Sequence, residues 1–127
     1  MSTARHVAEI DKLRARPFPD GDGGPGFHLA LLAESPSLLD ADPAEVLRTL
    51  EEYAAEVQAV IEVLALRWGD PRVFYGIPGP LLARMGSVPA LYGWQVDGRT
   101  VALGMTESAP DEPVRLYATM ADVTLIG

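Results

Sequence analysis

The hydrophobic positions within residues 43–68 repeat at the spacing of one face of an α-helix. The stripe advances in steps of three and four residues: Val46, Leu50, Tyr53, Val57, Ile61, Leu64 and Trp68. Asp42 is a favourable N-cap and Pro43 suits the first helical position. Gly69 can adopt the left-handed conformation that ends a helix, and Pro71 cannot continue one. The pattern therefore predicts a long amphipathic helix over residues 43–68.

A second pattern, the alternation of a β-hairpin, covers residues 90–105 and turns on Asp97-Gly98. A two-residue hairpin turn needs positive φ at both central positions, which Asp-Gly allows. This turn sets a register that places large apolar side chains on one face: Tyr92, Trp94, Val101 and Leu103. The opposite face carries smaller and more polar residues. We expect the first face to pack on a core.

Three shorter segments complete the predicted domain. Residues 113–120 alternate as a strand, and residues 27–33 and 72–77 are apolar runs of strand length. Residues 3–16 repeat apolar positions at helical spacing. The expected fold is α+β, with an antiparallel sheet of three to five strands. One face of this sheet packs on the long amphipathic helix, and the N-terminal helix is an accessory element.

The chain divides into two parts in this interpretation. Residues 1–26 form an N-terminal helical arm that ends in a linker rich in proline and glycine. Residues 27–127 form a single α+β domain, since 127 residues suffice for one substantial core.

Charge and composition narrow the classes of partner. The net charge is −8, from 18 acidic and 10 basic residues. An acidic domain is repelled by nucleic-acid phosphates and by anionic membranes, so we expect neither as a partner. There is no cysteine, no apolar run that could span a membrane and no secretory leader pattern in the first residues. We therefore expect a cytoplasmic protein, and a homodimer is one option.

Catalytic and metal-binding motifs are lacking. The segment Gly76-Ile-Pro-Gly79 has no Lys-Ser/Thr sequel and so does not match a phosphate-binding loop. Asp20-Gly-Asp22 lacks the later ligands of a calcium loop. His6 and His28 are the only histidines, and neither accompanies a nucleophile motif. We predict no catalytic residue, no metal and no cofactor.

Two surfaces supply candidate binding residues. The first combines acidic positions on the outer face of the long helix with polar positions on the far side of the sheet: Glu51, Glu52, Glu56, Gln95, Thr100, Arg115 and Tyr117. The second is a pocket between helix and sheet, with an imidazole and three aromatic side chains as candidates: His28, Tyr53, Tyr75 and Trp94. A hydrated helix face and a sheet covered by its own chain would explain the same patterns without a partner.

The favoured function is a non-enzymatic protein-binding domain of the immunity or inhibitor type. Its acidic side chains would steer a basic protein partner, and occlusion of that partner would neutralise it. One alternative is a small-molecule-binding or enzymatic domain with a pocket between sheet and helix. A further alternative is a homo-oligomeric structural protein joined through the basic arm or an edge strand.

Overall fold

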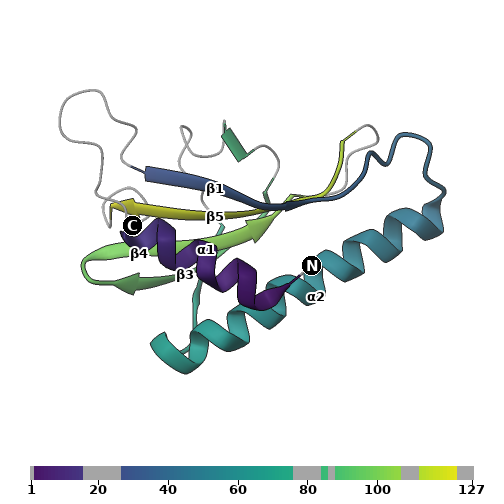
Figure 1. The fold of residues 1–127 in the computed structure, drawn as a ribbon. Coiled ribbons are helices and arrows are strands. Elements are labelled where there is room, and N and C mark those ends of the chain that lie inside the picture. The colour runs from purple at the N-terminus through teal and green to yellow at the C-terminus, as the bar shows by residue number, and fades with distance from the viewer. Residues whose placement is uncertain (1, 16–26, 76–83, 86–87, 107–111, 123–127) are drawn as a thin grey trace.

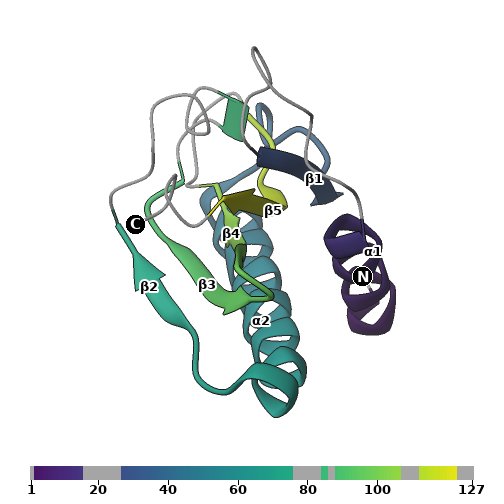
Figure 2. The same cartoon turned by 90° about the vertical axis from the view of Figure 1, so that its left-hand side faces the viewer.

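The computed structural model describes residues 2–15, 27–75, 84–85, 88–106 and 112–122 (Figure 1). Along the chain the elements are α1 (Thr3–Ala15), β1 (Phe27–Glu34), α2 (Pro43–Trp68), β2 (Arg72–Phe74), β3 (Leu91–Val96), β4 (Arg99–Met105) and β5 (Arg115–Asp122). The strands form one antiparallel sheet in the order β1-β5-β4-β3-β2. Both helices pack on the same face of this sheet (Figure 2). The predicted α+β class is confirmed.

Helix α2 begins and ends at the residues that the sequence predicts. The Asp42 carboxylate accepts a hydrogen bond of 2.9 Å from the Glu45 amide. At the other end Gly69 has φ 82°, and its amide donates to the Ala65 carbonyl. These bonds satisfy backbone groups that a helix terminus leaves without partners. The fully buried positions of α2 face the sheet: Tyr53, Val57, Val60, Ile61 and Leu64.

The Asp97-Gly98 hairpin joins β3 to β4 in the predicted register. Asp97 has φ 53° and Gly98 has φ 77°, as a turn with two left-handed residues requires. Trp94 pairs with Val101, and the other observed pairs run from Tyr92–Leu103 to Val96–Arg99. Trp94 is buried against α2, and its indole N–H donates a hydrogen bond of 2.7 Å to the Gly69 carbonyl.

The remaining elements extend the sheet on both sides of the hairpin. Strand β5 lies between β1 and β4 and buries the alternate apolar residues Leu116, Ala118 and Met120. Helix α1 covers the β1–β5 side and buries Val7, Ile10 and Leu13. Strand β2 is the other edge and is shorter than predicted, because it ends at Phe74. Residues 76–77 of the predicted strand lie outside the described residues.

The face of the sheet that points away from the helices also carries a core. Its buried members come from all five strands and from the segment before β3: Phe27, Phe74, Met85, Val88, Leu91, Ala102, Tyr117 and Ala121. Glycines on this face leave room for that packing. A Cβ added to Gly93 would lie 2.8 Å from the Phe74 ring, and one added to Gly104 would lie 2.8 Å from the Ala90 carbonyl oxygen. The small residues on this face therefore accommodate the protein's own chain.

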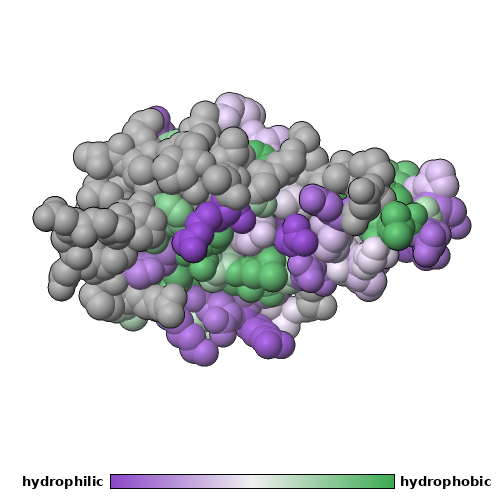
Figure 3. Space-filling view, turned by 90° about the horizontal axis from the view of Figure 1, so that it is seen from above, coloured by the Kyte–Doolittle hydropathy of each residue, from purple (hydrophilic) through white to green (hydrophobic). Residues whose placement is uncertain are grey.

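The first turns of α2 project beyond the sheet (Figure 1). Two leucines here are exposed, Leu39 by 64% before the helix and Leu47 by 57% in its second turn. Hydrophobic surface is visible at the end of the molecule where α2 begins (Figure 3). These side chains belong to neither core, so this end is more apolar than folding alone requires.

Two buried threonines on the face of the sheet away from the helices differ in their hydrogen bonds. They therefore allow a matched test of how hydrogen bonding on this face affects stability. The Thr119 hydroxyl donates to the His28 carbonyl at 2.7 Å, whereas the Thr100 hydroxyl has no partner among the described residues. A buried hydroxyl without a partner is destabilising, and an apolar group of the same shape removes that cost. We expect Thr100→Val to raise the free energy of unfolding by about 1 kcal/mol and Thr119→Val to lower it by about 1 kcal/mol. Urea denaturation of both variants would contradict this account if their effects had the same sign.

Candidate functional site

The three glutamates predicted on the outer face of α2 have different surroundings. Glu56 accepts hydrogen bonds from the Nδ1 atom of His6 at 2.9 Å and from the Thr3 hydroxyl at 3.0 Å. The His6 and Glu56 side chains are only 5% and 11% exposed, so this carboxylate holds α1 against α2. Glu51 and Glu52 are exposed, but they lie on different flanks of the helix.

The predicted polar residues of the sheet do not form one open surface. Gln95 is exposed, whereas Thr100 and Tyr117 are buried on the far face. Arg115 is half-buried, and its Nε atom donates to Glu34 at 2.6 Å. This hydrogen bond is the main cause that raises the pKa of Arg115 above its usual value. Of these four side chains only Gln95 is fully exposed.

The predicted pocket residues are separated in the fold. His28 lies on β1, where it pairs with Met120 of β5. Tyr75 directly follows β2, and 77% of its surface is exposed. Tyr53 lies on the buried face of α2. Desolvation by burial raises its pKa, and the negative charges of Glu34 and Glu52 raise it further. Trp94 is a core residue whose ring meets Trp68 edge-on at 5.7 Å between centroids. These four side chains do not line a common cavity among the described residues.

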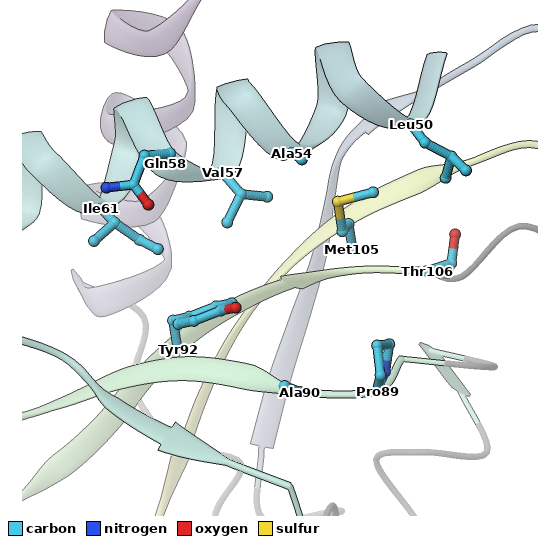
Figure 4. A pocket seen from close by; sticks show the side chains of 10 residues that line it. All are labelled: Leu50, Ala54, Val57, Gln58, Ile61, Pro89, Ala90, Tyr92, Met105 and Thr106. Carbon is cyan, nitrogen blue, oxygen red and sulfur yellow. The ribbon is translucent and has the colours of Figure 1, made fainter. Parts of the chain in front are cut away.

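A different cavity lies between α2 and the β3–β4 hairpin. Its volume is about 550 Å³. Figure 4 shows side chains from the helix on one side and from the two strands on the other. The lining residues are Leu50, Ala54, Val57, Gln58, Ile61, Pro89, Ala90, Tyr92, Met105 and Thr106. Ala54, Gln58 and Pro89 are exposed, so the cavity opens to solvent.

Short side chains at two facing positions create this space. Ala54 on α2 and Ala90 before β3 bring only a methyl group to the cavity, whereas Leu50 and Met105 reach further into it (Figure 4). The alternation of the hairpin and the stripe of α2 assign most lining residues to the core. The signal that could have revealed a cavity is the pair of alanines among large apolar neighbours.

The lining is suited to binding apolar groups. None of its ten residues carries a carboxylate, imidazole, amine or thiol. Its polar groups are the amide of Gln58 and the hydroxyls of Tyr92 and Thr106. The Thr106 hydroxyl already accepts a hydrogen bond from the Arg115 amide at 2.8 Å. Such a cavity offers apolar contact area with few hydrogen-bonding groups, which is typical of a binding pocket.

Acidic residues border the solvent side of the cavity. Glu51 lies three residues before Ala54 on α2, and Glu62 lies four residues after Gln58, so each shares a helix face with a lining residue. The Gln58 amide contacts Glu62 at 3.5 Å. With a net charge of −8, the surroundings of the cavity attract cations and repel anions.

Metal and membrane sites were also sought among the described residues. In that part of the chain no three His, Asp or Glu side chains gather closely enough to hold a metal ion. Neither described helix combines the length and the hydropathy needed to cross a membrane.

Comparison of the chain with protein-family models, with curated proteins and with solved structures finds no match.

Proposed function

We propose that this protein is a non-enzymatic protein-binding domain and that the cavity between α2 and the β3–β4 hairpin receives an apolar group of its partner. The observation that carries the proposal is the apolar lining of an open cavity of about 550 Å³. A buried apolar anchor in a pocket commonly dominates the affinity of a protein interface. The proposed anchor point is this cavity and not the outer acidic face of α2 that the sequence suggests.

The charge around the cavity favours a basic partner. Glu51 and Glu62 border it, and neither appears in a salt bridge among the described residues. Rim charges of this kind accelerate encounter and select partners of opposite charge more than they add affinity. An inhibitor of the immunity type would use both features. Its acidic residues would steer a basic protein toward the cavity, and the cavity would anchor that protein. The surrounding surface would then cover the functional site of the partner.

A small apolar molecule is the second candidate, because pockets for such ligands commonly have volumes of 300–1,000 Å³ and this cavity lies within that range. A photoreactive side chain placed in the cavity would distinguish the two candidates, because it would form an adduct either with a protein or with a small molecule.

Photocrosslinking from two adjacent alanines tests the proposal. Ala54 lines the cavity and Ala55 does not, yet both are exposed on α2. With a leucine-sized diazirine amino acid at position 54, which leaves most of the cavity open, irradiation in native cytosol should give one dominant protein adduct that position 55 does not give. A mass increase of a few hundred daltons would instead favour the small molecule. Equal adducts from both positions would contradict a binding site in this cavity.

A further inference from the structure

The sheet is wider than the two helices that cover it. Neighbouring strands lie about 4.8 Å apart, so the two outer strands of a five-stranded sheet are roughly 19 Å apart, whereas the axes of two packed helices are only about 8–10 Å apart. Helix α1 contacts β1 and β5, and α2 contacts β4 and β3. Among the described elements no helix lies beyond α2 on the β2 side (Figure 2). One side of the helix layer therefore ends over β3.

Apolar side chains continue across this uncovered side. Val73 of edge strand β2 is 42% exposed and pairs with half-buried Tyr92 on β3. On α2 the same flank continues from the cavity toward exposed Leu47. The flank consists of positions spaced by three and four residues: Leu47, Leu50, Ala54, Gln58, Ile61 and Ala65. At about 1.5 Å per residue it extends over roughly 27 Å, which is five helical turns.

We propose that a basic amphipathic helix of the partner protein lies in this strip, beside α2, as a third helix on this face of the sheet. This inference rests on the proposed function and names the structure and charge of the partner segment. Its apolar face would enter the cavity between Ala54 and Ala90, where short side chains permit close approach. Its basic residues would face Glu51 and Glu62, which lie about 16 Å apart along α2.

Helix α1 shows how such a helix binds on the opposite flank of α2. It is amphipathic and buries Val7, Ile10 and Leu13. Its polar edge forms an ion pair with α2, since Arg67 donates to the Asp11 carboxylate at 3.0 Å and 3.1 Å. The strip on the other flank offers the same combination of apolar floor and charged edge, but its charges are acidic. A partner helix there would extend the layer over β3 and β2.

A designed peptide tests this directly. The probe is an 18-residue helix with leucine on one face and lysine on its flanks, added to the full chain labelled with nitrogen-15. Amide shifts should move at Leu47, Ala54, Val73 and Tyr92. A peptide of the same composition with scrambled leucines, and one with glutamate in place of lysine, should bind about tenfold more weakly or worse.

Matched substitutions locate the peptide. Leu47→Lys and Val73→Lys should each weaken binding about tenfold, because each places a repelling charge in the strip. Leu66→Lys is the control for an added positive charge on α2, since Leu66 is 89% exposed and is not one of the positions of the strip. The inference is wrong if Leu66→Lys weakens binding as much, if the scrambled peptide binds equally, or if the shifts occur at α1.

The outcome is separable from that of the proposed function. If position 54 crosslinks a protein partner but the helical peptide leaves Leu47 and Val73 unmoved, the cavity binds the partner and the helix proposal fails. If position 54 gives no specific adduct and the peptide also fails to bind, both proposals fail.

Discussion

Replacing Glu56 by alanine is expected to lower the free energy of unfolding by about 3 kcal/mol. The Glu56 carboxylate accepts hydrogen bonds from His6 and Thr3, and the His6 side chain is 5% exposed. Hydrogen bonds to a charged group commonly contribute about 1.5–3 kcal/mol each, and the Glu56 carboxylate accepts two of them, from side chains that would lose their partner without regaining water. Urea denaturation followed by tryptophan fluorescence measures the loss.

Glu52→Ala is the matched control for this substitution. Glu52 is exposed one turn earlier on α2 and makes no described contact with α1. Its replacement should change stability by less than about 0.5 kcal/mol. Amide hydrogen exchange adds a local readout, since Glu56→Ala should speed exchange in α1 more than in β4. If Glu52→Ala and Glu56→Ala lowered the free energy of unfolding equally, the contact between Glu56 and α1 would not be what makes Glu56 stabilising.

Trp94→Ala is expected to lower the free energy of unfolding by about 3–5 kcal/mol, the usual cost of truncating a buried aromatic side chain. The Trp94 ring is 4% exposed, meets Trp68 edge-on and donates to the Gly69 carbonyl at 2.7 Å. It thereby connects the hairpin to the C-terminal end of α2. Trp94→Phe keeps most of the apolar area and should cost about 1 kcal/mol through the lost hydrogen bond.

Tyr75→Ala provides the comparison for Trp94. Both aromatic residues are candidates for a ligand pocket on sequence grounds, but Tyr75 is 77% exposed. Its removal should change stability by less than about 0.5 kcal/mol. Thermal or urea unfolding of the two variants would refute the packing account if Trp94→Ala were as stable as Tyr75→Ala.

Features encoded by neighbouring residues could be predicted from the sequence. The cap at Asp42, the positive φ of Gly69 and the stripe between them determine α2 locally. The Asp97-Gly98 turn likewise determines which residues of β3 and β4 face each other. In both cases the backbone preference and the hydrophobic period indicate the same element. The α+β class follows from these two elements and the alternating strand over β5.

Features that depend on contacts between distant segments could not be predicted in the same way. The pairing of Glu56 with His6 joins residues fifty positions apart, so an acidic helix face gave no sign that one of its members is partly buried against α1. The burial of Thr100 depends on a second core built from several segments. The cavity is set by how closely α2 approaches the hairpin at Ala54 and Ala90, which hydrophobic spacing does not specify.

The measurement that tests the central claim most directly is the yield of photocrosslinked protein from position 54 relative to position 55. The account predicts a dominant adduct from position 54 that is absent from position 55. Ala90→Trp, which fills the cavity from the opposite wall, should abolish that adduct while leaving the fold intact by circular dichroism. An adduct that survives Ala90→Trp, or equal yields from the two positions, would contradict a partner-binding site between α2 and the β3–β4 hairpin.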